Sequence, residues 1–334
     1  MARKKTFIGL VLAVSVLFGT LSALTFGPLA MNQARSVAAA DGDVWEFALI
    51  GDTRYTDEQK GKFPNLIADI NKHTQLMFTV HDGDIKGGSD ACLDSIYHDT
   101  KTLFNQFQAP LIFTPGDNDW TDCHRAGGPT GNSIERLNFE RSLFFGDAFS
   151  MGVRKMGQQR QPGYPENARW SMNRIMFATL NIQGSNNNLA RNGEQDAEYI
   201  ARNVANLNWM TQTFDLAKAN GSIAVMIIVQ ANMWDNIPVS QLEGFKDTKL
   251  QLERDVINFG KPVVWVNGDS HYFRIDKPIV GVKSQRRLEN FTRVETFGTD
   301  DVHWVRVTVD PSDPNIFTFR QMIVTANKVN QVVP

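Results

Sequence analysis

Four Gly-Asp pairs in this sequence each follow a short apolar run, and their acids are Asp52, Asp84, Asp117 and Asp269. Each apolar run predicts a buried strand, so each carboxylate is expected at the C-terminal end of a strand. Such ends can converge along one edge of a sheet, where several carboxylates repel one another unless a cation lies between them. The pattern therefore predicts a metal site with Asp84 at its centre. The alternative for any single pair is a polar turn that binds nothing.

Strand-like and helix-like segments alternate along most of the chain and would position these acids. The predicted strands span residues 44–50, 76–80, 111–114, 169–172, 175–180, 222–229 and 263–267, and the predicted helices span 63–70, 96–107, 134–145, 196–218 and 250–259. Residues 151–166 are expected to form a loop, and residues 184–188 a turn. The last segments, 291–294, 303–309 and 316–322, alternate as antiparallel strands do.

This order of elements predicts the fold class. Strand–helix alternation followed by a run of strands favours an α/β (α+β mixed) fold, a four-layer α/β/β/α sandwich of two mixed sheets flanked by helices. No repeat or linker divides the sequence, so residues 41–330 are expected to form a single domain. The 334 residues are 42% hydrophobic and 21% charged, which suits a globular chain with a large core.

The N-terminus has the pattern of a targeting segment. Three basic residues at positions 3–5 precede an uncharged, largely apolar stretch, and three alanines at 38–40 offer a cleavage point. Residues 1–40 are therefore expected to be a signal peptide, with an uncleaved membrane anchor as the alternative. Either way the folded part is exported, as a periplasmic or secreted protein or one anchored to a membrane. Without residues 1–40, which hold four basic residues and no acid, the formal charge falls from −2 to −6, so nucleic acid is not indicated as a partner.

The two cysteines follow two of the predicted strand ends. Cys92 comes eight residues after Asp84, and Cys123 comes six residues after Asp117. Because exported proteins form disulfides readily, the two loops are expected to be bridged; two free thiols are the alternative.

The motifs, in this order, resemble those of the calcineurin-like metallophosphoesterase superfamily. The match extends from Gly51-Asp52 to Gly268-Asp269-Ser270-His271 and covers most of the chain after the targeting segment. The resemblance implies a double β-sandwich flanked by helices, with two metal ions bridged by the acid of the second motif. Asp84 matches the bridging position, Asp52 matches the first ligand, and His271 matches the last histidine of the closing motif.

Several family histidines are replaced in this chain. Arg54 stands in place of the first-motif histidine, Asn118 in place of the catalytic histidine, and Asp269 in place of the first closing histidine. The asparagine ligand of the third motif becomes Asp117, and no histidine follows the strand at 222–229. Arg54 cannot bind a cation, but it could clamp a phosphate or replace a missing positive charge. The simpler alternative is an ion pair between Arg54 and Asp52, with the other carboxylates capping loops.

These replacements favour oxygen over imidazole ligands. Mn²⁺ or Mg²⁺ is therefore favoured, with Fe, Ca²⁺ or Zn²⁺ as alternatives. One ion is expected at Asp52, Asp84 and His271. A second ion would draw on the remaining oxygen ligands: Asp84, Asp117, Asp269 and the side chain of Asn232 or Gln230.

The resemblance implies hydrolysis of a phosphate mono- or diester by a metal-activated hydroxide, acting on a small phosphorylated substrate. Asn118 can donate only a neutral hydrogen bond to a leaving group, so His81, His98 and His124 are alternative acids, although each is more often structural. The competing function is a catalytically degenerate relative that binds a metal or phosphate as a sensing module. The substrate, the number of ions and the oligomeric state are not predicted.

Overall fold

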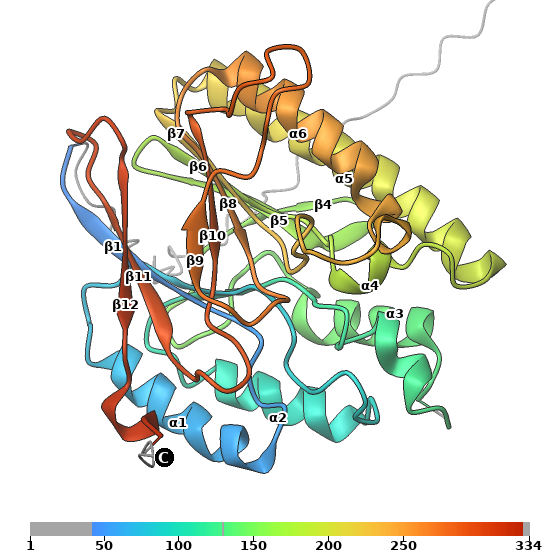
Figure 1. The fold of residues 1–334 in the computed structure, drawn as a ribbon. Helices are drawn as coiled ribbons and strands as arrows, with labels where there is room; N and C mark the ends of the chain where they lie inside the picture. The colour runs from blue at the N-terminus through green and yellow to red at the C-terminus, as the bar shows by residue number, and fades with distance from the viewer. Residues whose placement is uncertain (1–41, 129, 330–334) are drawn as a thin grey trace, which may run out of the picture. The chain divides into compact units, whose positions relative to one another are not determined.

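The structure, a computed structural model, describes residues 42–128 and 130–329 (Figure 1). All of them belong to the second of the two units into which the chain divides, Ser36–Pro334. The predicted signal peptide lies outside the described residues and stays a prediction, as does the single domain over 41–330. Among the described residues no helix is both long and apolar enough to span a membrane.

The first sheet has five strands in the order β12-β11-β1-β2-β3. Their bounds are β1 Trp45–Ile50, β2 Thr79–His81, β3 Leu111–Phe113, β11 Trp304–Val309 and β12 Phe317–Met322. Strands β1, β2 and β3 are parallel, whereas β11 is antiparallel to both β1 and β12. The C-terminal ends of β1, β2 and β3 therefore point in one direction, which brings the loops that follow them together.

The second sheet has seven strands in the order β4-β5-β6-β7-β8-β10-β9. Their bounds are β4 Gln159–Gln161, β5 Tyr164–Met172, β6 Ile175–Thr179, β7 Ala224–Ile228, β8 Val263–Asn267, β9 Arg274–Asp276 and β10 Phe291–Glu295. Strands β6, β7, β8 and β10 run parallel, and the other pairings are antiparallel. The antiparallel prediction for residues 291–294 was therefore wrong with respect to β8, and the loop predicted at 151–166 contains β4 and the start of β5.

Helices cover the outer faces of both sheets. Helices α1 Asp57–Asn71, α2 Asp94–Phe104 and α3 Ser133–Phe144 contribute to the core on the first sheet, and α5 Gly193–Ala219 and α6 Lys246–Phe259 contribute to the core on the second (Figure 1). The short elements are α4 Gly184–Asn187, η1 Thr121–Arg125, η2 Val239–Gln241, η3 Glu243–Phe245 and η4 Thr325–Asn327. These layers confirm the predicted sandwich of two mixed sheets flanked by helices.

A core rich in aromatic side chains holds the two sheets together. Phe47 of β1 stacks on Phe78 with ring centroids 4.6 Å apart, and Trp170 of β5 stacks on Phe177 of β6 at 5.2 Å. Phe78 meets Phe177 edge-on at 5.4 Å and so links the two stacks. All four rings are buried, and burial of apolar surface is the main source of stability here. This packing fixes β1 and the start of β2 in the first sheet against β5 and β6 in the second.

Candidate metal centre

The predicted strand-end acids meet where the two sheets face each other. Asp52 and Asp84 follow β1 and β2 of the first sheet, whereas Asp269 and His271 follow β8 of the second. The site is therefore formed by loops of both sheets. The sequence had suggested the edge of a single sheet. One carboxylate oxygen of Asp52, one of Asp84 and one ring nitrogen of His271 all lie within 4.8 Å of one another. Three side chains that can bind a metal therefore converge.

The glycines before Asp52, Asp117 and Asp269 make room for a neighbouring carboxylate, whereas Gly83 before Asp84 makes room for the side chain of Gln230. A Cβ atom on Gly116 would lie 2.0 Å from Oδ1 of Asp84, and one on Gly268 would lie 1.8 Å from Oδ2 of Asp52. Both distances are far below van der Waals contact, so a side chain at either position would displace a candidate ligand. The Gly-Asp pattern therefore indicates that neighbouring loops approach closely, rather than that the chain makes a tight turn.

Three of the four strand-end acids, together with His271, adopt left-handed backbone conformations. The φ angles are 46° at Asp52, 60° at Asp84, 79° at Asp269 and 60° at His271. Such angles are costly for residues other than glycine and persist where the surrounding structure enforces them, often at functional sites. Here the enforcing contacts include the backbone N–H of Asp52, which donates to Gly83 O at 2.9 Å.

Tyr55 joins the three candidate ligands, although the sequence gave no reason to choose it. Its hydroxyl donates to Oδ2 of Asp84 at 2.8 Å and lies 3.3 Å from both Oδ1 of Asp52 and Nε2 of His271. The backbone at Arg54 is left-handed, with φ of 73°. The side chains of Arg54 and Tyr55 therefore point in different directions. The only sequence signal was an aromatic hydroxyl three residues after a strand-end acid.

Arg54 does not take the position predicted for it. Its guanidinium donates to Thr100 and forms an ion pair with Asp99, both on α2, and it lines a different pocket together with Lys86. Asp99 satisfies the arginine charge there, so neither the phosphate clamp nor the alternative ion pair with Asp52 is found. The role proposed for Arg54 in binding phosphate is corrected accordingly.

Gln230 fills the space expected for a second ion. Its Nε2 lies 3.2 Å from Oδ2 of Asp84, 3.2 Å from Oδ1 of Asp117 and 3.3 Å from Oδ1 of Asp269. Its Oε1 accepts a hydrogen bond from the backbone N–H of Gly184 at 2.5 Å. That donor fixes the orientation of the amide, because an N–H cannot donate to an NH₂ group. The amide of Gln230 thus bridges the three carboxylates.

Asn232 also departs from its predicted role as a ligand. Its Oδ1 accepts from Arg293 at 2.7 Å and its Nδ2 donates to Ser270 Oγ at 2.5 Å, so both ends of the amide are engaged elsewhere. Only its backbone N–H reaches the carboxylates, donating to Oδ2 of Asp269 at 3.0 Å. Asn232 therefore orients Asp269 and offers no oxygen of its own.

Asn118 likewise meets the cluster through its backbone. Its N–H donates to Oδ1 of Asp84 at 3.0 Å, while its side-chain oxygen points toward Gly88. Asp119, which the sequence analysis did not select, caps this loop region: its carboxylate accepts from the backbone N–H groups of Asp84, Ile85 and Gly116 at 2.7–2.9 Å. The loop-capping alternative thus holds for Asp119.

The three histidines considered as acids lie outside the cluster. His81 is buried against the rings of Phe104 and Phe113, and burial lowers its pKa to about 3, so it is neutral. His98 is exposed on α2, and His124 is exposed and contacts Arg191. Among the described residues, His271 is the one histidine that touches these carboxylates.

The charges of the cluster fit a cation. Burial raises the pKa values of Asp52 and Asp84, and burial followed by repulsion from Asp117 raises the pKa of Asp269 to about 8. No Lys or Arg among the described residues forms an ion pair with these three acids. Burial also lowers the pKa of His271, which keeps the imidazole neutral as a metal ligand must be. Two carboxylates and one imidazole suit a divalent ion.

Comparison with known proteins identifies the architecture. No family model and no curated protein matches the chain. Among solved structures, the chain is similar to GAP50, the anchor in the inner membrane complex of Plasmodium, with a TM-score of 0.51, 11% identity and 86% of each chain covered. It is similar to PhoD, with a TM-score of 0.51 and 12% identity over 82% of this chain and 66% of that one. It is also similar to the purple acid phosphatase PPD1 of yellow lupin, with a TM-score of 0.51 and 11% identity over 86% and 53%.

The chain shares the two-sheet sandwich fold of these structures. At identities of 11–12% the likeness concerns the fold alone. The chain spans about two thirds of PhoD and about half of the lupin enzyme.

The predicted disulfide is present in this fold. Cys92 and Cys123 are bonded, with their Cα atoms 5.6 Å apart. The bond joins the loop after Asp84 to η1, which follows Asp117. It therefore fixes two of the acid-bearing loops to each other.

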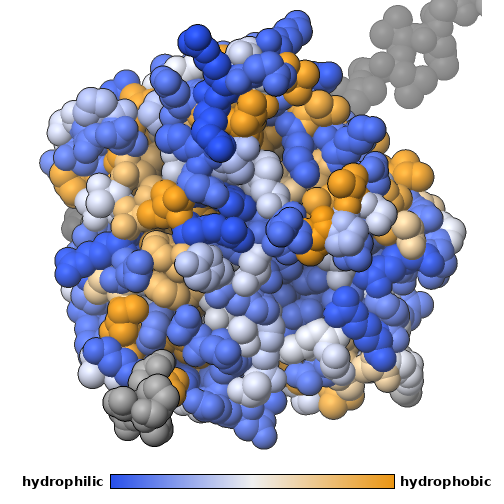
Figure 2. All heavy atoms as spheres, in the orientation of Figure 1, coloured by the Kyte–Doolittle hydropathy of each residue, from blue (hydrophilic) through white to orange (hydrophobic). Residues whose placement is uncertain are grey.

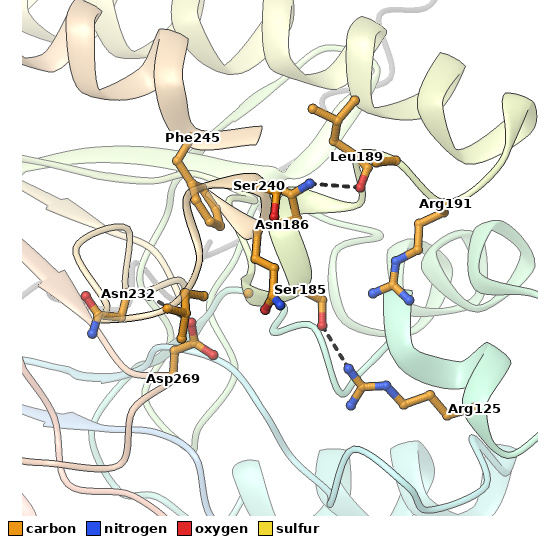
Figure 3. Close-up of a pocket in the computed structure, with 13 residues that line it drawn as sticks. Arg125, Ser185, Asn186, Leu189, Arg191, Asn232, Ser240, Phe245 and Asp269 are labelled. Atoms are coloured by element: carbon orange, nitrogen blue, oxygen red, sulfur yellow. Dashed lines mark hydrogen bonds between the residues drawn. The ribbon is translucent and has the colours of Figure 1, made fainter. Parts of the chain in front are cut away.

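A pocket of about 400 Å³ opens beside the acids (Figure 3). Asp269 and Asn232 lie on one side of it, and Arg125 and Arg191 lie on the other, with Ser185 between them (Figure 3). The face seen in the space-filling view is mostly hydrophilic, with scattered apolar side chains (Figure 2). Neither arginine belongs to a Gly-Asp motif, so the sequence gave no reason to select them.

Proposed function

We propose that this protein is a metal-dependent phosphoesterase that hydrolyses a phosphate mono- or diester. The observation that carries the proposal is the convergence of Asp52, Asp84 and His271 within 4.8 Å at the strand ends of a metallophosphoesterase-type fold. The structural similarity to a purple acid phosphatase and to PhoD supports the same class of reaction.

Asp52, Asp84 and His271 would hold the ion. Tyr55 would orient the carboxylate of Asp84 through its hydrogen bond to it. When bound, a divalent cation would activate water and neutralise charge that develops on the phosphoryl oxygens. The backbone N–H of Asn118 donates to Oδ1 of Asp84 and the Tyr55 hydroxyl donates to Oδ2, so both oxygens of this carboxylate are held in place. Mn²⁺ or Mg²⁺ suits this oxygen-rich set better than Zn²⁺ does.

We propose a single ion per chain. The amide of Gln230 already compensates Asp84, Asp117 and Asp269 by hydrogen bonds, and turning it to present oxygen would break its bond from Gly184. A second ion at that place would have to displace a buried amide. The earlier expectation of a second ion there is therefore not retained.

The residues around the centre also bear on the substrate. Among the described residues no histidine other than His271 reaches the carboxylates, so a general acid for the leaving group is not evident there. Esters with good leaving groups, such as aryl phosphates, depend least on such an acid. We also propose export, on the basis of the targeting pattern in residues 1–40 and the disulfide.

The proposal is tested by assaying hydrolysis of p-nitrophenyl phosphate and bis-p-nitrophenyl phosphate with EDTA or with each of Mn²⁺, Mg²⁺, Ca²⁺, Zn²⁺ and Fe²⁺. Turnover is expected with at least one ion, to be absent in EDTA, and to fall at least about 100-fold in Asp84→Asn. Asp255→Asn, at another buried acid with a raised pKa, on α6, is the matched control and should keep its activity.

Rates equal to those of Asp84→Asn with every ion would reject the enzyme. Ion binding without turnover would then favour the metal- or phosphate-binding module.

A further inference from the structure

The pocket beside the metal centre has a positively charged rim that hydrolysis of a phosphate does not require. Arg125 and Arg191 both pair with the same buried acid, Asp122, with nitrogen–oxygen distances of 2.8 and 2.9 Å. One carboxylate thus faces two guanidinium groups, which leaves an excess of positive charge. Arg125 has 45% of its side-chain surface exposed and Arg191 has 19%, so both can reach a ligand in the pocket.

The wall between this rim and the candidate ligands is a strained turn. Four successive residues, 185–188, have φ between 49° and 69°, which is the left-handed region. Buried contacts hold the turn: Arg202 donates to Oδ1 of Asn187 at 2.7 Å, and Asn187 donates to Gly244 O at 3.1 Å. Within it, the hydroxyl of Ser185 lies 2.7 Å from Oδ2 of Asp117 and 2.9 Å from Oδ1 of Asp122. The turn therefore connects the arginine rim to the carboxylate cluster.

The rest of the pocket lining includes apolar side chains. Phe245, which is 2% exposed, and Leu189 line the pocket (Figure 3), and Ile237 lines it as well. The volume of about 400 Å³ is far more than a phosphate needs and suits a small organic molecule. The pocket thus offers an apolar surface together with a cationic rim, and Asp269 is part of both the pocket and the acid cluster.

We propose that this pocket binds the alcohol part of the phosphoester and recognises a second anionic group on it through Arg125 and Arg191. The substrate class is then a phosphoester of a small, partly apolar alcohol that also carries a carboxylate or a further phosphate. Guanidinium groups bind both anions with paired hydrogen bonds, and Asp122 holds the two arginines in place. This inference rests on the proposed function, because it takes the acid cluster as the place of hydrolysis.

The test compares kcat/KM for p-carboxyphenyl phosphate and phenyl phosphate in the wild-type protein, Arg191→Gln and Arg125→Gln. The measured quantity is the ratio of kcat/KM for p-carboxyphenyl phosphate to kcat/KM for phenyl phosphate. The reactivity of each leaving group is the same in every variant, so a change in this ratio on mutation measures recognition of the carboxylate. The ratio is expected to fall at least about tenfold in either variant, mainly through KM. Arg254→Gln, an exposed arginine on α6, is the control and should leave the ratio unchanged.

An equal loss on both esters, or no loss, in variants whose thermal unfolding is cooperative would overturn the inference. Arg191→Lys serves as a second variant: it keeps the charge for folding but loses the paired hydrogen bonds, so it should also lower the ratio. If the wild-type protein hydrolyses neither ester, the proposed function fails, and the inference is decided by calorimetric binding of the same two compounds. Tighter binding of p-carboxyphenyl phosphate that is lost in Arg191→Gln supports the pocket, and equal binding of both compounds rejects it.

Discussion

At the scale of single residues, Tyr55 and Gln230 organise the acid cluster by hydrogen bonds. The tyrosine hydroxyl contacts all three candidate ligands, and the glutamine amide satisfies three carboxylates at once. Both are neutral, so they satisfy hydrogen bonds and leave the negative charge for an ion.

Tyr55→Phe is expected to weaken Mn²⁺ binding about 10–100-fold, because groups that orient metal ligands typically contribute that much to affinity. Isothermal titration of the metal-free protein measures the effect. Tyr272→Phe, at an exposed tyrosine next to His271, is the control and should bind Mn²⁺ as the wild-type protein does. Unchanged affinity in Tyr55→Phe would show that the hydroxyl only fills space.

Some site residues could be foreseen from the sequence and others could not, for a definite reason. Asp52, Asp84 and His271 follow strands, and strand order places such residues together. Arg54 and Asn232 sit beside the same motifs, yet their side chains turn to partners on α2 and at Arg293. Those directions depend on local φ angles and on distant partners, which spacing in the sequence does not encode.

At the scale of elements, the left-handed segment after β6 carries backbone strain that substitution can relieve. Ala190 follows the turn with φ of 66° and is exposed, so it has no side-chain contact to lose. Ala190→Gly is expected to stabilise the protein by about 0.5–1 kcal/mol, since the left-handed cost of about 1–2 kcal/mol exceeds the entropy cost of glycine. Urea denaturation measures the difference.

The matched control is Ala201→Gly, at an exposed alanine inside α5, which should destabilise by about 0.5–1 kcal/mol. If both substitutions destabilised equally, the strain at Ala190 would be refuted.

The acid-bearing loops should make stability depend on pH in a metal-sensitive way. The pKa of Asp269 is about 8 in the folded protein, raised from 3.8, so the folded state holds a proton that the unfolded state has released. Stability is then greatest below the unfolded value and is lost as pH rises toward the folded one. The histidines with lowered pKa values change their charge only below pH 6.5. Between pH 6.5 and 8 the pH dependence of stability therefore comes mainly from the carboxylates. In EDTA, Tm is expected to fall across this window.

Mn²⁺ should reduce that fall, because the ion binds ionised carboxylates and neutral imidazole. Asp269→Asn should reduce the fall of Tm with pH in EDTA, since it removes one of the buried carboxylates whose pKa is raised into this window. A Tm in EDTA that rises with pH between 6.5 and 8 would contradict the charge arrangement assigned to Asp269.

At the scale of the whole molecule, the sandwich was predictable because apolar runs of strand and helix period alternate along the chain. The buried run at β7 and the amphipathic helices on both sides follow directly from that pattern. The direction of β10 and the existence of β9 were not predictable, because alternation along a strand does not state which strand lies beside it. Partner choice is set by the complete sheet.

The disulfide ties two acid-bearing loops together and closes a loop of the chain 31 residues long. Cys92→Ser with Cys123→Ser is expected to lower the free energy of unfolding by about 2–4 kcal/mol, chiefly by releasing the unfolded chain. Urea denaturation measures this, and the wild-type protein in dithiothreitol should lose the same amount. No change in either measurement would show that the bond contributes little to stability.

The central claim is one metal ion held by Asp52, Asp84 and His271, and calorimetric titration of the metal-free protein with Mn²⁺ tests it most directly. The account predicts one ion per chain for the wild-type protein and for Asp255→Asn, and none for Asp84→Asn. Two ions per chain would contradict the role given to Gln230. Binding that survives in Asp84→Asn, or no binding to the wild-type protein, would contradict the metal centre itself.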